Sequence, residues 1–593
     1  MIANMRMAAV LVLLASVMFA QNNRTVTGSP NDWPDRDRYL ALDVDPIPSF
    51  HPTQKLHSAK AMIAGVTNPF AVHEGLETLK RGGSAADAAL TTALAQIALN
   101  AGAAMSYAGI LTAVYYDANS GKVYSLNAGW STPRNETEPL SIPRPGTASG
   151  RTALVPGFMA GVQALHERFG RRPFAELFEP SIWLADRGFP LPPLVAAWRR
   201  DEAASLARLE DTRRIFQKED GKYYDQGDIF RQPQLAQTLK QIASQGAQYM
   251  YRGAWAHRFV DAVQREGGKI TLQDIADYRP LWSEPARAMY HGYEVTSLGL
   301  PSLGGLGTLS ALLLAESAKL SKRGDYWHSA DGLYSLIQIG KIATVLTFAP
   351  EDDLRKIFPG LDLALDSRLA PTTTKRLATI LRDRNWFTNA LAARPKPVPN
   401  HSSSVVVVDE QGNVAALVHS CNCVLWGTTG IFVDGISIPD AADYQQAAIS
   451  RTEPGGRLAD STIPVIALRD KRPVLASATI GGYGLLDVTL QNLINVLDLG
   501  MDPQASVNRP NFLGPFFGFD VHGSVHGEPT KEVLDRGFPD SVINGLKKRG
   551  QDIYVGADAV MHSGYWIGIQ IDPKNGALSG GAGRRLNSLV EGY

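Results

Sequence analysis

Apolar residues in this chain recur with two different spacings, which together predict helices packed against sheets. A 3.6-residue period predicts helices, whereas alternating or continuous apolar runs predict strands. No repeat or low-complexity linker divides the chain, so we expect one compact body. The expected helices cover residues 69–81, 84–99, 158–169, 173–187, 304–320 and 487–499, and the expected strands cover residues 62–66, 110–116, 122–126, 293–298, 462–468, 473–478, 559–571 and 577–579.

Two apolar runs joined by a polar turn predict a β-hairpin between residues 402 and 418. Four consecutive valines at positions 405–408 predict a strand that is buried on both faces, residues 409–413 have turn chemistry, and residues 414–418 form the returning strand. A proline-rich segment, residues 393–400, precedes the hairpin and cannot be helical. A cut between this extended segment and the three serines at 402–404 would place a serine at a new N-terminus inside a core.

Composition supports a large globular body and argues against two classes of partner. Of the 593 residues, 44% are hydrophobic and 20% are charged, so disorder is excluded as the general state of the chain. Lys plus Arg number 58 and Asp plus Glu number 58, with no long basic run. Binding to nucleic acid or to an anionic membrane surface therefore has no electrostatic support.

The N-terminus predicts export. One positive charge in residues 1–6 precedes an apolar run over residues 7–20, and polar residues follow, which is typical of a signal peptide cleaved after Ala20. An uncleaved anchor is the alternative. No later segment is long and apolar enough to span a membrane, so we expect a mature chain without a span in the periplasm or outside the cell. Residues 21–57 are expected to be an irregular lead-in.

Cys421 and Cys423 are the two cysteines of the chain. A disulfide across one intervening residue is strained, and two thiols make a poor metal site without histidines at ligand spacing. We therefore expect both to be small, buried core residues. The sequence predicts no metal and no organic cofactor.

Ser402 is a candidate nucleophile of an unusual kind. The chain lacks the common metalloprotease, phosphate-binding and serine-hydrolase motifs. A serine at an N-terminus needs no histidine, because its own α-amine, with a pKa of about 7.7 to 8.0, can act as the base. Gly481 and Gly482 follow an expected strand and could present backbone N–H groups to an oxyanion. A loop cap for the serines and a tight turn for the glycines are the alternatives.

The chain resembles the γ-glutamyltransferases (γ-glutamyltranspeptidases), and the resemblance extends over almost the whole mature chain. The matching segments keep the family's order and spacing, and they are residues 82–88, 155–161, 169–190, 277–280, 292–295, 300–305, the hairpin, 481–482 and 495–503. The resemblance implies a four-layer αββα N-terminal-nucleophile hydrolase. It also implies a precursor that cleaves itself into two subunits that stay together.

The resemblance assigns roles to particular residues of this chain. Cleavage falls between His401 and Ser402, giving a signal peptide over 1–20, a large subunit over 21–401 and a small subunit over 402–593. Ser402 stands where the family normally has a nucleophilic Thr. The other implied site residues are Ser420 supporting the nucleophile, Asn422, Asp460 and Ser461 binding substrate, and Gly481 and Gly482 forming the oxyanion hole.

Several positions depart from the family pattern around the substrate. The arginine that binds the glutamyl α-carboxylate should lie just before Pro133, yet residues 126–133 contain none, and the acidic residues that hold the α-amine are replaced near residues 435–440. We therefore expect an exported amidase that hydrolyses or transfers a γ-glutamyl or related acyl group from a small-molecule or peptide amide. A non-catalytic, unprocessed relative that keeps the fold is the alternative.

Overall fold

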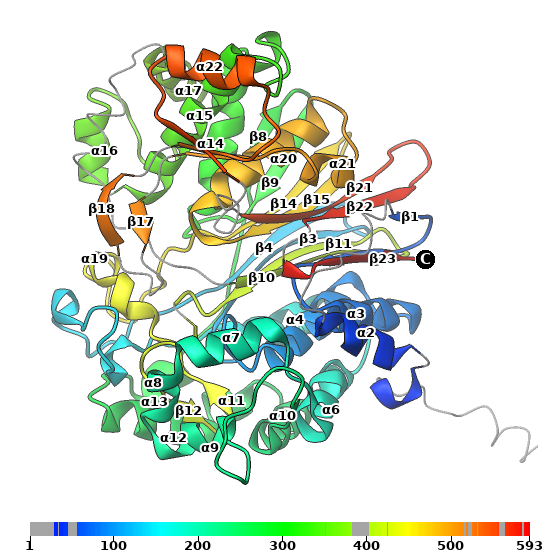
Figure 1. The fold of residues 1–593 in the computed structure, drawn as a ribbon, viewed down its shortest axis with the longest axis vertical. Coiled ribbons are helices and arrows are strands. Elements are labelled where there is room, and N and C mark those ends of the chain that lie inside the picture. The colour runs from blue at the N-terminus through cyan, green and yellow to red at the C-terminus, as the bar shows by residue number, and fades with distance from the viewer. Residues whose placement is uncertain are drawn as a thin grey trace, which may run out of the picture.

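Two seven-stranded sheets, stacked face to face, lie at the centre of the computed structural model (Figure 1). The structure describes residues 29–33, 35–44, 56–349, 351–381, 402–423, 425–514, 517–519, 525–529, 532–556, 564–583 and 586–593. Neighbouring strands in both sheets are antiparallel. The first sheet has the order β23 (Leu589–Gly592), β2 (Met62–Gly65), β10 (Ser402–Val408), β11 (Val414–Ser420), β3 (Ile110–Asp117), β4 (Lys122–Ala128), β7 (Leu281–Ser283), and the second has the order β1 (Leu56–Ser58), β22 (Leu578–Ala582), β21 (Tyr565–Ile571), β15 (Arg472–Ile480), β14 (Ile463–Arg469), β9 (Tyr293–Ser297), β8 (Ala286–Tyr290).

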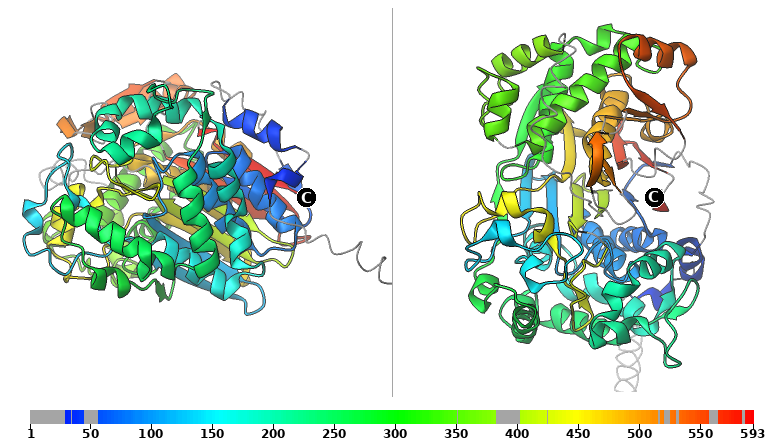
Figure 2. Two further views of the ribbon diagram at one scale, coloured as in Figure 1. Left: turned by 90° about the horizontal axis from the view of Figure 1, so that it is seen from below. Right: turned by 60° about the vertical axis from the view of Figure 1, so that its left-hand side comes forward.

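Helices cover the outer face of each sheet (Figure 1 and Figure 2). One apolar cluster joins Val405 and Val407 to the first helical layer, a second joins Val465 to the other layer, and a third lies between the sheets and contains Val406 and Ile466. This arrangement confirms the expected αββα fold. The first layer includes α3 (Pro69–Lys80), α4 (Ala85–Leu99), α5 (Phe158–Phe169), α6 (Glu179–Arg187), α10 (Pro233–Gln245) and α12 (Ala254–Arg265), and the second includes α14 (Gly304–Ser317), α15 (Ala330–Phe348), α17 (Pro371–Ile380), α20 (Leu485–Leu497) and α22 (Asp540–Lys548).

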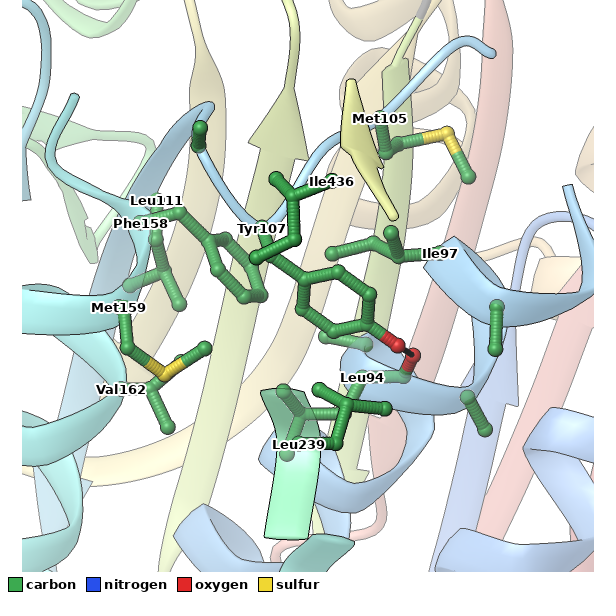
Figure 3. Packing of buried hydrophobic residues seen from close by; sticks show 14 of the residues in the cluster. Leu94, Ile97, Met105, Tyr107, Leu111, Phe158, Met159, Val162, Leu239 and Ile436 are labelled. Carbon is green, nitrogen blue, oxygen red and sulfur yellow. Dashed lines mark hydrogen bonds between the residues drawn. The ribbon is translucent and has the colours of Figure 1, made fainter. Parts of the chain in front are cut away.

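Helix α4 is buried along its whole length beneath the valine hairpin. Its many alanines let it pack closely on all sides, which a helix with long side chains could not do. The Ser84 side chain and Asp87 form a capping box at its start. Figure 3 shows Tyr107 lying between Leu94 of α4 and Phe158 of α5, with its hydroxyl donating to the Leu94 carbonyl at 2.9 Å.

Two expectations about secondary structure are wrong in detail. The helix expected over residues 173–187 is divided into a 3₁₀ turn, η4 (Phe174–Phe178), and α6, because Pro180 can stand only in the first turn of a helix. The expected irregular lead-in contains a helix, α2 (Arg36–Asp43). Tyr39 of α2 stacks on His73 of α3 at 3.7 Å between ring centroids, so tertiary contact stabilises a segment with no strong helical pattern.

Cys421 and Cys423 are both buried thiols, which confirms the expectation of core residues. Burial raises the pKa of the Cys423 thiol, and the hydrogen bond with Cys421 raises it further, so Cys423 is a protonated thiol at neutral pH. Among the described residues, no helix is long and apolar enough to cross a membrane.

Asp409 fixes the hairpin turn against helix α4, and its removal should destabilise the fold. Its carboxylate accepts hydrogen bonds from Ala85 N at 3.0 Å, Asn413 N at 2.9 Å and Asn413 Nδ2 at 2.8 Å. Asp409→Ala leaves these buried donors unsatisfied, so we expect a loss of about 3 kcal/mol in the free energy of unfolding. Urea unfolding measures this loss. The exposed Asp366→Ala is the control, and equal midpoints for the two variants would contradict the assignment.

Candidate functional site

The ends of several strands meet at one end of the sandwich and form the candidate site. Ser402 begins β10 and pairs with Ser420 at the end of β11, and Ser420 pairs with Ile110 at the start of β3. Thr112 lies two residues further along β3. Its hydroxyl is 2.8 Å from the hydroxyl of Thr462, which immediately precedes β14 of the other sheet. Because β14 and β15 are antiparallel neighbours, the end of β15 lies at the same place.

Ser402 and Ser420 are joined by a hydrogen bond between their side chains. Ser402 Oγ donates to Ser420 Oγ at 2.8 Å, and Asn422 N donates to the same oxygen at 2.8 Å. Asn422 has a φ of +53°, which turns the chain sharply after β11 and brings its N–H back to Ser420. Gly109 passes so close that a Cβ there would lie 2.4 Å from the Ser420 carbonyl oxygen. The structure thus brings together Ser402, Ser420 and Asn422 as the sequence predicts, whereas His401 lies outside the described residues.

The three adjacent serines have different surroundings. Ser403 faces the helical layer, and its hydroxyl donates to the Val66 carbonyl at 2.5 Å. Ser404 faces the other sheet, is fully buried, and has an Oγ without a hydrogen-bond partner in the structure. Ser402 is only partly buried. Of the three, Ser402 alone combines access to solvent with a second side-chain hydroxyl.

His419 lies next to Ser420 but cannot act as a base at this site. It pairs with Ser403 across the hairpin and points to the helical layer, where its Nε2 lies 2.8 Å from Gln96 Oε1. Burial lowers the pKa of His419 to about 3, so the imidazole is neutral. The imidazole of His419 therefore faces the helical layer, and the base of the reaction stays a prediction.

Gly481 and Gly482 follow strand β15 and precede helix α20, in the turn where the sequence predicts an oxyanion hole. Gly481 has φ +104° and ψ +69°, and Gly482 has φ +52°. A Cβ added at Gly482 would meet no atom within 4 Å, so the requirement there is conformational rather than steric. The turn lies at the same end of the sandwich as Ser402, and its part in catalysis stays a prediction.

Asp460 bridges three segments of the chain through its carboxylate. It accepts hydrogen bonds from Asn127 Nδ2 at 2.7 Å, Ser302 Oγ at 2.7 Å, Thr462 N at 3.0 Å and the Thr462 hydroxyl. These contacts occupy the carboxylate, so Asp460 holds the neighbouring Ser461 in place at the junction of the two sheets. Contact of either residue with substrate stays a prediction.

A buried pair of carboxyl groups, Asp440 and Asp443, lies near the site and was not predicted from the sequence. Asp440 Oδ2 accepts hydrogen bonds from Thr428 N at 2.6 Å and Thr428 Oγ1 at 2.8 Å, and the carboxyl groups of Asp440 and Asp443 are hydrogen-bonded to each other. Burial raises the pKa of Asp440. Burial and the charge of Asp440 raise the pKa of Asp443 well above its usual range.

The carboxyl pair lies close to the strand ends of the site. Ala441 and Ala442, between the two aspartates, pack in one cluster with Ile110 and with Trp130, which follows β4. The resemblance led us to expect that acidic residues were replaced near residues 435–440. A pair spaced three residues apart, just beyond a proline, was the signal that could have identified this cluster.

Comparison with known proteins agrees with the geometry. The family model described as Gamma-glutamyltranspeptidase matches residues 71–593. The glutathione hydrolase proenzyme of Pseudomonas aeruginosa is 27% identical over 543 residues, which cover 84% of this chain and 92% of that protein. The acylase ACY 1 proenzyme of Pseudomonas sp. (strain SE83) is 26% identical over 415 residues, covering 69% of this chain and 70% of that protein. The solved cephalosporin acylase from Bacillus halodurans shares the fold, with a TM-score of 0.74 at 23% identity over 93% of this chain and 98% of that one.

The two glycines of the turn should respond differently to substitution by alanine. The φ of +104° at Gly481 lies outside the left-handed region open to L-residues, whereas the φ of +52° at Gly482 lies inside it. We expect Gly481→Ala to lower the free energy of unfolding by about 2 to 3 kcal/mol and Gly482→Ala by about 1 kcal/mol. Urea unfolding of the two variants checks this order, and a larger effect at Gly482 would refute the backbone argument.

Proposed function

Because this chain belongs to the γ-glutamyltranspeptidase family, we propose that it is an exported, self-processing amidase with Ser402 as nucleophile. The hydrogen bond from Ser402 to Ser420, at the end of a strand buried on both faces, is the observation that carries the proposal. It orients a hydroxyl at the position that becomes an N-terminus after cleavage. The relatives named as proenzymes support processing, and the names glutathione hydrolase and acylase support amide chemistry.

Self-processing uses the same hydroxyl as the later reaction. Ser402 Oγ attacks the carbonyl carbon of His401, the C–N bond between the two residues breaks, and the hydroxyl proton passes to the departing nitrogen. Water then hydrolyses the resulting ester. The products are a carboxylate on His401 and a Ser402 with a free hydroxyl and a free α-amine.

In the processed protein, the α-amine of Ser402 takes the hydroxyl proton as Oγ attacks the amide carbon of the substrate. The N–H groups of the Gly481–Gly482 turn stabilise the negative charge that develops on the carbonyl oxygen. The α-amine returns the proton to the leaving amine, which departs and leaves an acyl ester on Ser402. Water or a second amine then attacks the ester, releases the acyl group as an acid or a new amide, and restores Ser402.

The acyl group carries an amine that binds the Asp440–Asp443 pair. Two buried carboxyl groups that are hydrogen-bonded to each other must keep a proton between them or meet an added donor. An ammonium group offers three donors and a positive charge. Its binding favours ionisation of both carboxyls, so the interaction strengthens as the pH rises towards the pKa of the amine.

Processing is tested on a denaturing gel with serine variants. The mature protein should give two fragments, one beginning near Gln21 and the other at Ser402, as N-terminal sequencing would show. Ser402→Ala should remain one uncut chain because the attacking hydroxyl is lost, while Ser403→Ala should still be cut. A single band for the wild-type protein would falsify self-processing and favour an unprocessed binding protein instead.

The amine subsite is tested with Asp443→Asn and a pair of amide substrates that differ only in acetylation of the amine. In the wild type, KM for the free-amine substrate should be about tenfold or more below KM for the acetylated substrate, because acetylation removes a charge-assisted hydrogen bond. In Asp443→Asn this preference should vanish. KM for the amine substrate should also fall with rising pH, more steeply in the wild type than in Asp443→Asn, since the raised pKa of Asp443 adds to that of Asp440.

Destabilisation of Asp443→Asn would not explain a lost substrate preference, because the raised pKa of Asp443 predicts that this variant gains stability. A carboxyl whose pKa is raised by folding contributes stability at low pH that is lost as the pH rises through its folded pKa. Asp443→Asn removes this dependence, so relative to the wild type it should gain stability as the pH rises above the ordinary pKa of an aspartate, about 3.9. An unchanged substrate preference in a folded Asp443→Asn protein would remove the amine from the proposal.

A further inference from the structure

Gln96 of helix α4 reaches across the beginning of strand β10 from the helical side. Its Nε2 donates to the Val66 carbonyl at 2.6 Å and to the Thr67 carbonyl at 3.2 Å, just after β2. Its Oε1 lies 2.8 Å from His419 Nε2 in β11. Strand β10 runs between β2 and β11, which lie about 10 Å apart across it. One fully buried side chain therefore joins both neighbours of β10.

The beginning of β10 has a paired strand on one side only. Strand β11 pairs with β10 from Ser402 onwards, whereas β2 pairs with it only from the fourth residue. The Val66 N–H still donates to the Ser404 carbonyl at 3.1 Å, and the chain then turns into α3. The Val66 carbonyl accepts from the Ser403 hydroxyl and from Gln96. Side chains thus replace the missing strand ladder at this end of β10.

The turn that Gln96 holds has an unfavourable backbone conformation. Thr67 and Asn68 have φ values of +66° and +58°, a left-handed conformation that is rare outside glycine and rarest for β-branched residues. Such a conformation persists only where the surrounding contacts fix it. Gln96 binds the Thr67 carbonyl, and Asn100 Nδ2 donates to Asn68 Oδ1 at 2.5 Å. Without the Gln96 amide, the turn is free to relax and to move the Val66 carbonyl away from β10.

The partners of Gln96 fix both the orientation of its amide and the tautomer of His419. Carbonyl oxygens can only accept hydrogen bonds, so the amide nitrogen faces the two carbonyls and the amide oxygen faces the imidazole. His419 Nε2 therefore carries a proton and donates it to Gln96 Oε1. His419 Nδ1 is buried and has no hydrogen-bond partner in the structure, so a second proton on the ring would be costly.

We propose that Gln96 is a positioning residue for the attack of Ser402 on the peptide bond that precedes it. Gln96 holds the Val66 carbonyl on one side of Ser403 and His419, which pairs with Ser403, on the other. The residue next to the nucleophile is therefore fixed from both sides. A small displacement of a reacting group can slow a reaction about a hundredfold. The proposal rests on the proposed self-processing and adds to it a dependence of the rate on Gln96.

The rate is measured on denaturing gels after pulse-labelled synthesis of the full-length chain. Gln96→Met keeps a side chain of similar length but removes its hydrogen bonds, so processing should slow about tenfold or more. Gln491→Met is the matched control. Gln491 is also buried and joins a helix to a strand, accepting from Phe512 N at 3.1 Å and donating to Phe512 O at 2.9 Å in the other helical layer. The control should process at the wild-type rate, while urea unfolding should show a similar loss of stability for both variants.

Gln96→Glu separates the position of the strand from simple packing. The introduced carboxyl can accept from His419 Nε2 at any pH, but it can donate to the Val66 carbonyl only while it is protonated. An added proton should go to this carboxyl, because His419 Nδ1 has no acceptor. The processing rate of Gln96→Glu divided by that of the wild type should therefore approach one as the pH falls and should decrease as the pH rises. The same ratio for Gln96→Met should not change with pH.

Three results would overturn the proposal. The first is equal processing rates for the wild type and Gln96→Met. The second is equal slowing in Gln96→Met and Gln491→Met, which would indicate a general loss of stability. The third is a rate ratio for Gln96→Glu that does not change with pH. A wild-type chain that stays uncut is a separate outcome, because it refutes the proposed self-processing itself and this proposal with it.

Discussion

The valine hairpin of β10 and β11 must be covered on both faces, and the rest of the fold satisfies this requirement. Val405 and Val407 need a helical layer on one side, while Val406 and Val408 need a second sheet on the other. Leaving either face in water would expose several large apolar side chains, each worth about 1.5 to 3 kcal/mol of burial. A buried hairpin at the centre also gives its first residue a fixed position relative to both sheets.

The fixed position of Ser402 at the start of the hairpin explains how a serine can take the place of the threonine that the family normally has. A threonine methyl restricts the rotamer of the hydroxyl, and serine lacks it. Here the hydroxyl of Ser402 is instead bound to Ser420, whose oxygen also receives the Asn422 N–H. Cross-strand pairing sets the two Cα positions, so the side-chain bond restricts one remaining torsion. The hydrogen bond between Ser402 and Ser420 thus restricts the side-chain rotamer, as the methyl group does in threonine.

Local patterns were sufficient to predict helices packed on sheets, and the family resemblance implied the four-layer sandwich, but neither predicted the hydrogen bonds that line its end. Four valines in a row, the alanine-rich helix α4 and the glycines after β15 each carry a strong local signal, and their elements lie within a few residues of the expected bounds. Helix α2 was missed because contact with His73, rather than its own sequence, stabilises it. The hydrogen bonds of Asp460 join three segments that are distant in sequence, and only the fold brings these segments together.

Two charged features near the site, the Asp440–Asp443 pair and Arg457, differ in how the protein compensates them. Asp440 and Asp443 can relieve their burial by holding a proton, because their pKa values are raised. Arg457 is instead held by three neutral oxygens, the Gly129 carbonyl, the Tyr278 hydroxyl and the Arg279 carbonyl. A proton therefore relieves the burial of the carboxyl pair, whereas neutral hydrogen-bond acceptors hold the arginine. The arginine missing from residues 126–133 does not remove positive charge from this region, because the guanidinium of Arg457 is hydrogen-bonded to Gly129 within that stretch.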